Sequence, residues 1–126
     1  MTLAEIKEMV MFQTNNDAED VGDYLPSLVD YANEGYDLLV YVYDKQHVDE
    51  MSADYPPLEM DVDEPNLPGW THKAIADWAT WLVYRNGNPQ KQQRGYAFRE
   101  AFEAIKSRLA AEPKNGPYNN FINIPK

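Results

Sequence analysis

The chain has 126 residues, enough for one domain with a sizeable core. It contains no cysteine, which excludes disulfide and thiol chemistry, and its formal net charge of -10 argues against nucleic acid or an acidic membrane as its main partner. The sequence has no run of about 18 apolar residues and no basic, apolar leader at its N-terminus. We therefore expect a soluble protein without a membrane partner.

The charge is divided along the chain. Residues 1–67 carry 17 Asp and Glu against 2 Lys, a net charge of -15, whereas residues 68–126 carry 4 acids against 9 Lys and Arg, a net charge of +5. Opposite charges on the two halves indicate either attraction within the molecule or attraction between molecules.

A first helix is predicted over residues 3–13. Thr2 and Glu5 have the spacing of a capping box, in which each side chain accepts a hydrogen bond from the other residue's backbone N–H. Apolar residues then recur at helical spacing, at Leu3, Ile6, Met9 and Val10.

A second helix is predicted over residues 24–43, with Pro26 in its first turn. Gly35 interrupts its apolar stripe at a cost of about 1 kcal/mol relative to alanine, which predicts a close crossing with another helix. The last residues, 38–43, are apolar on all sides and are also compatible with a strand.

Residues 44–68 are predicted to form a long acidic loop or a loose hairpin. Four prolines interrupt any helix there, and the mutual repulsion of eight Asp and Glu favours an extended chain. A connection of this length without secondary structure is usually functional or mobile.

Two further helices are predicted over residues 70–86 and 89–111, joined by a very short turn. Gly87 suits the left-handed residue that ends many helices, Asn88 suits an N-cap, and Pro89 suits the first helical position. The pattern thus predicts an all-α bundle of four main helices over residues 1–112, followed by an extended C-terminal arm over 113–126.

The chain offers little catalytic chemistry. His47 and His72 lie at the two ends of the acidic segment, but no HExxH or EF-hand spacing accompanies them, so a solvated acidic loop is the better interpretation than a metal site. No nucleophile elbow or phosphate-binding glycine loop is present either. We therefore expect no enzyme activity, no catalytic residue, no metal and no cofactor.

The segment "NGNPQKQQRGY" raises the sharpest question, because Lys91 and Arg94 stand at a helix start. The helix dipole is positive there, so a cation costs up to about 1 kcal/mol unless an anion meets it. Three interpretations follow. The helices could form a DNA-reading helix-turn-helix, the cations could be solvated and balanced by the chain's own acids, or they could form a protein interface.

The interface hypothesis pairs a basic group with an acidic group on another copy or on a partner. The basic group is Arg85, Lys91, Arg94 and Arg99, and the acidic group is Asp17, Glu19, Asp20 and Asp23. The expected aromatic and tail anchors are Trp70, Trp81, Phe121, Ile122 and Ile124. Such head-to-tail contacts can close into a ring, and an acidic lining would let DNA pass without binding.

Two segments cover about two thirds of the chain: "MTLAEIKEMVMFQTNNDAEDVGDYLPSLVDYANEGYDLLV" and "HKAIADWATWLVYRNGNPQKQQRGYAFREAFEAIKSRLA". Both resemble the head-tail connector (head-completion adaptor) proteins of long-tailed bacteriophages and prophages. The resemblance implies a small helical bundle that assembles as a ring, in the virion or in the host cytoplasm during assembly. It implies as partners further copies of the chain, the portal protein and a tail-side adaptor, with DNA only as passing cargo. The long acidic loop departs from the family's simplest pattern.

Overall fold

The computed structural model describes residues 1–14, 25–44 and 54–112. Its elements, in chain order, are α1 (Leu3–Gln13), η1 (Leu25–Ser27), α3 (Leu28–Tyr43), η2 (Gly69–Thr71), α4 (His72–Arg85) and α5 (Pro89–Ala111). The described residues include four α-helices and no strand, which confirms the all-α prediction and excludes the strand alternative for residues 38–43.

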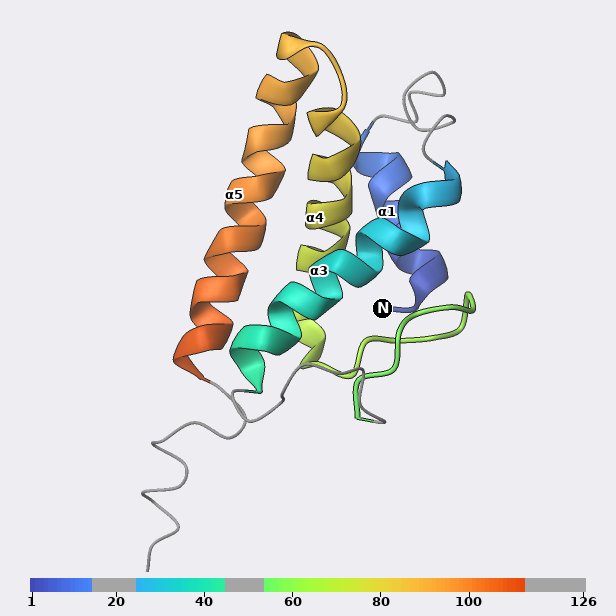
Figure 1. Ribbon diagram of the computed structural model, residues 1–126, viewed down its shortest axis with the longest axis vertical. Helices are drawn as coiled ribbons and strands as arrows, with labels where there is room; N and C mark the ends of the chain where they lie inside the picture. Colours follow the sequence, from blue (N-terminus) through green and yellow to red (C-terminus); the bar gives the residue numbers. More distant parts are fainter. Residues whose placement is uncertain (15–24, 45–53, 113–126) are drawn as a thin grey trace, which may run out of the picture.

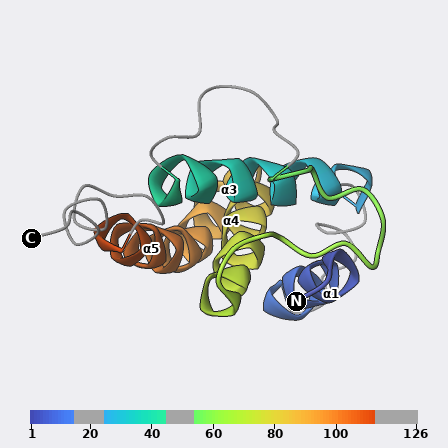
Figure 2. The same cartoon turned by 90° about the horizontal axis from the view of Figure 1, so that it is seen from below.

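The four helices form two layers (Figures 1 and 2). Helices α1, α4 and α5 lie side by side, with α4 in the middle, and α3 crosses one face of this layer. Of the 14 residues of α4, 11 are buried, because the helix packs against α1, α3 and α5 at once. The core of the molecule therefore surrounds α4.

Local sequence signals set most helix ends as expected. At α1, the Thr2 hydroxyl accepts a hydrogen bond from Glu5 N at 3.2 Å while the Glu5 carboxylate accepts one from Thr2 N at 2.9 Å, so the capping box is confirmed. At α5, Asn88 Oδ1 accepts a hydrogen bond from Lys91 N at 3.0 Å, and Pro89 occupies the first turn.

The role predicted for Gly87 is wrong. Its φ lies outside the left-handed region, and the chain turns out of α4 through a hydrogen bond from Gly87 N to Tyr84 O at 3.0 Å. Glycine is still needed for space, because a Cβ at this position would lie 2.8 Å from Cβ and Cδ of Lys91. The tight turn thus depends on a missing side chain and not on an unusual backbone angle.

Glycines also allow the closest helix crossings. A Cβ on Gly35 would lie 3.1 Å from Trp78 Cβ, which confirms the predicted close crossing, here between α3 and α4. Gly95 does the same between α5 and α4, where an added Cβ would lie 2.8 Å from both Trp81 Cε3 and Tyr84 Cβ.

Residues 54–68, called the strap here, contain no helix or strand, yet they pack closely on the bundle. Leu58 is 1% exposed, and its N–H and C=O are both bonded by the side chain of Asn33, at 2.7 and 2.8 Å. Backbone carbonyls of the strap also accept hydrogen bonds from Leu3 N and Ala4 N, two N–H groups in the first turn of α1 that have no acceptor within the helix. The predicted loop is confirmed for residues 54–68. Buried Tyr55, Leu58 and Leu67 hold it against the bundle, whereas Met60 and Val62, which stand directly between acids, are exposed.

Candidate interaction surfaces

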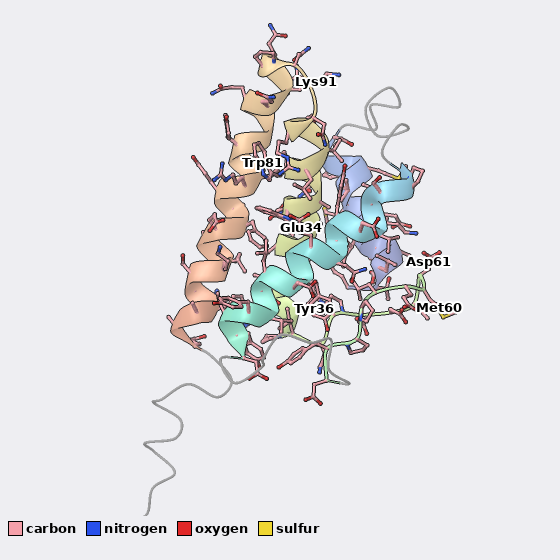
Figure 3. The ribbon with its side chains drawn as sticks, viewed as in Figure 1. Glu34, Tyr36, Met60, Asp61, Trp81 and Lys91 are labelled. Carbon is pink, nitrogen blue, oxygen red and sulfur yellow. The ribbon has the colours of Figure 1, made fainter. Side chains whose placement is uncertain are left out.

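Opposite charges are separated in space as well as along the chain. The strap carries five acids and no Lys or Arg, and α3 presents Asp30, Glu34 and Asp37 on one exposed stripe. Helix α5 carries five Lys and Arg against two Glu. Asp61 in the strap and Lys91 at the start of α5 lie at opposite ends of the molecule (Figure 3). We call the strap and the exposed stripe of α3 the acidic edge, and α5 the basic edge. Because α3 crosses α5, the two edges are well separated only between the strap and the first turns of α5.

The predicted basic residues differ in what surrounds them. Arg85 and Arg94 are exposed, and no carboxylate of the described residues lies within the 4.0 Å of an ion pair from either one. Lys91 is half-buried against the Gly87 turn. The Arg99 guanidinium lies 5.6 Å from the centre of the Trp81 ring, so part of its charge faces an aromatic surface of the same molecule.

The basic residues do not form a single patch. Arg94 and Arg99 are five positions apart on α5, which places them about 140° apart around the helix axis. Gln92 joins the two helices at this end, because its Nε2 donates a hydrogen bond to Arg85 O at 3.1 Å. Arg94 and Arg99 thus lie on opposite sides of the buried stripe of α5, which contains Gly95, Phe102 and Leu109, and not on one exposed face.

The two predicted aromatic anchors are unequally accessible. Trp81 is only 6% exposed, and its ring stacks on Tyr96 with a centroid distance of 5.2 Å. Trp70 is 37% exposed, and the Arg108 guanidinium lies 4.2 Å from its ring centre. Trp70 therefore has more surface for a partner than Trp81 has.

The predicted acidic group, Asp17, Glu19, Asp20 and Asp23, lies outside the described residues, as do His47 and the tail anchors Phe121, Ile122 and Ile124. The acids that the structure does place belong to α3 and the strap, and the sequence analysis did not choose them. The sequence did indicate that three of these acids share one helix face, because Asp30, Glu34 and Asp37 are four and three positions apart.

His72 is buried and uses both ring nitrogens. Nε2 lies 2.9 Å from Leu67 O, which can only accept, so we assign the ring hydrogen to Nε2. Nδ1 lies 2.7 Å from the Met1 amino group and then accepts from it. Within the described ranges no group of three or more His, Asp or Glu is placed to hold a metal ion. His72 here links the strap, the chain start and α4.

A buried polar network between α1 and α4 was missed by the sequence analysis. Asp77 is 3% exposed, and its Oδ1 accepts hydrogen bonds from Gln13 Nε2 at 2.8 Å and Lys73 Nζ at 3.0 Å. Thr80 Oγ1 donates to Gln13 Oε1 at 2.7 Å. The one sign of this network in the sequence was Asp77, a single carboxylate within the apolar pattern of α4. The hydrogen bonds from Gln13 to Asp77 and from Thr80 to Gln13 join α1 to α4, so the network fixes how these two helices lie against each other.

The connection between α4 and α5 bears on the DNA-reading alternative. A helix-turn-helix crosses its two helices at about 90–120°. Helices α4 and α5 instead run antiparallel, side by side over the length of α4 (Figure 1). In this αα-hairpin α5 packs along α4 and does not project from it as a recognition helix does. The geometry therefore does not favour DNA reading by a helix-turn-helix.

The part of the chain that the structure describes has no helix long and apolar enough to cross a bilayer.

Comparison of the chain with protein-family models, with curated proteins and with solved structures finds no match in any of the three.

Proposed function

We propose that this chain is a structural protein that assembles with copies of itself through its basic and acidic edges, in the manner of a phage head-tail connector. The observation that carries the proposal is the separation of the two edges, together with the exposed Arg85 and Arg94, for which the described residues provide no carboxylate. The connector role, with a portal protein and a tail-side adaptor as partners and DNA as passing cargo, is supported by the sequence resemblance.

The position of Arg94 supports an external partner. It lies in the second turn of α5, its side chain is exposed, and no carboxylate of the described residues is paired with it, so its charge is open to an acid of another molecule. An acid of a second copy at this point would stabilise both the arginine and the helix start. A single exposed ion pair contributes only about 0–1 kcal/mol, so the interface needs several pairs and buried apolar area as well.

The arrangement of the edges determines the kind of assembly. They are different surfaces of the molecule, so a contact between them is heterologous and leaves a free edge on each copy. Such contacts propagate until they close into a ring or continue as a filament. A ring is the form that the connector resemblance implies.

Light scattering at several protein and salt concentrations tests the proposal. At low salt we expect a mass several times the 14.5 kDa of one chain, and at about 1 M salt, where the Debye length is about 3 Å, a shift toward that single-chain mass. Arg94→Gln should raise the concentration needed for assembly. Ser107→Glu is the matched control, because it changes the net charge equally at an exposed position on the same helix, about 20 Å away.

Two results would contradict the proposal. One is a mass of 14.5 kDa at every concentration and salt level. The other is an equal effect of Arg94→Gln and Ser107→Glu, which would mean that total charge matters and the position of Arg94 does not.

A further inference from the structure

The outer face of α1 carries a shallow groove that the proposed charge pairing does not use. It is lined by Glu5, Glu8, Met9 and Phe12 of the helix and by Met1, which precedes the helix. Met1 and Met9 are half-buried and pack against the core, whereas Phe12 is 73% exposed. The exposed Phe12 ring beside the two methionines gives the groove an apolar lining that a partner could cover.

The charge of the groove restricts what can bind there. Both of its charged lining residues, Glu5 and Glu8, are acidic and exposed. The Glu5 carboxylate already accepts a hydrogen bond from Thr2 N, whereas the carboxylate of Glu8 makes no contact within the described residues. The groove therefore fits an apolar segment that carries positive charge and no negative charge.

The C-terminal residues of this chain have that composition. Residues 113–126 contain no Asp or Glu and two lysines, Lys114 and Lys126, which stand on either side of Phe121, Ile122 and Ile124. We propose that the α1 groove binds residues 121–124 of a neighbouring copy, with the flanking lysines attracted to the acidic side of the molecule. This inference rests on the proposed self-association.

The reach of the chain favours a neighbour over the same molecule. Helices α1 and α5 are the two edges of their layer, with α4 between them (Figure 2). Interaxial spacings of about 8–10 Å place α1 about 16–20 Å from α5, and its outer face about 5 Å further. Phe121 lies nine residues beyond Glu112, at most about 30 Å of fully extended chain. Little slack remains for a path around the end of the bundle, while a neighbour has no such restriction.

Disulfide trapping tests the contact, because the chain has no cysteine of its own. One sample carries Glu8→Cys in the groove and the other Asn123→Cys, which leaves the apolar tail residues in place. Mixed under mild oxidation at low salt, they should form a Glu8→Cys–Asn123→Cys dimer. Glu112→Cys is the matched control, an exposed carboxylate outside the groove and outside both edges, and should cross-link at least about tenfold more slowly.

A second substitution tests the apolar part of the contact. Phe12→Ser, added to Glu8→Cys, should slow the cross-link by about tenfold or more, because it removes the largest apolar surface of the groove. Phe12→Leu keeps an apolar side chain at the same position of the groove and should retain most of the rate. Circular dichroism of each variant confirms that the helices are intact.

The outcomes separate this inference from the proposed function. Assembly by light scattering without a faster groove cross-link would overturn the groove contact and leave self-association standing. A protein that remains a monomer would overturn both. A Glu8→Cys/Asn123→Cys double variant that closes only within single chains, at a rate independent of concentration, would show that the groove binds the tail of its own molecule and would also overturn the inference.

Discussion

Gly95→Ala should destabilise the protein, although alanine is the better helix former. An alanine Cβ at this position would lie 2.8 Å from Trp81 Cε3 and from Tyr84 Cβ, whereas carbon atoms in contact normally lie about 3.5–4.0 Å apart. The Tyr84 Cβ moves only with its backbone, so α4 and α5 must separate at their crossing. Overpacking of this kind costs about 1–3 kcal/mol, against about 1 kcal/mol gained in helix propensity.

Gly35→Ala is the matched comparison, since Gly35 is also buried within a helix and also faces a tryptophan. Its added Cβ would lie 3.1 Å from Trp78 Cβ, so a shift of a few tenths of an ångström relieves the contact. The gain in helix propensity is the same at both sites and cancels in the difference. We therefore expect the unfolding free energy of Gly95→Ala to be about 1–2 kcal/mol below that of Gly35→Ala.

Urea unfolding followed by circular dichroism at high salt measures this difference under conditions that suppress assembly. For a chain of 126 residues, 1 kcal/mol corresponds to about 4 °C in the thermal midpoint, so a melting experiment also resolves it. Equal stability of the two variants, or a more stable Gly95→Ala protein, would refute the close α4–α5 crossing as described.

Three further changes test local contacts. Thr80→Val removes the donor to the Gln13 side chain at nearly constant volume and should lower the unfolding free energy by about 1–2 kcal/mol in urea titration. Asn88→Ala should cost about 1 kcal/mol through loss of the α5 N-cap, whereas Asn88→Asp should keep the stability of the wild type. Hydrogen bonds from the N–H groups of Met60 and Glu59 lower the pKa of the Asp63 carboxyl below its ordinary 3.8. Its contribution to stability is therefore present above that pH and lost as the pH falls below it, so Asp63→Asn should reduce the loss of stability seen on acidification toward pH 3.

The local parts of the fold could be predicted from the sequence. The capping box at Thr2 and the cap at Asn88 involve residues within three positions of each other, so the sequence pattern alone carries them. The packing of the strap could not be predicted in this way. Leu58 is surrounded in sequence by prolines and acids, and the residue that binds its backbone, Asn33, is 25 positions away.

The candidate surfaces were predictable in sign but not in position. Counting charges along the chain showed which half is acidic and which is basic. It did not show that Arg99 covers Trp81, because that contact depends on how closely α5 approaches α4 at Gly95. Nor did it distinguish Phe12, which is 73% exposed, from the buried apolar residues of the same helix.

The burial along α5 connects the fold with the proposed assembly. Only Gly95, Phe102 and Leu109 of its 23 residues are buried, whereas α4 buries 11 of 14. The packing of α5 on α4 is concentrated in this narrow stripe, and most of its other side chains are exposed or half-buried. Arg94, in its second turn, is exposed and has no paired carboxylate among the described residues. Contact with an acidic surface of another copy would cover part of this exposed side of α5 and pair Arg94, so we expect assembly to change the surroundings of α5 more than those of α4.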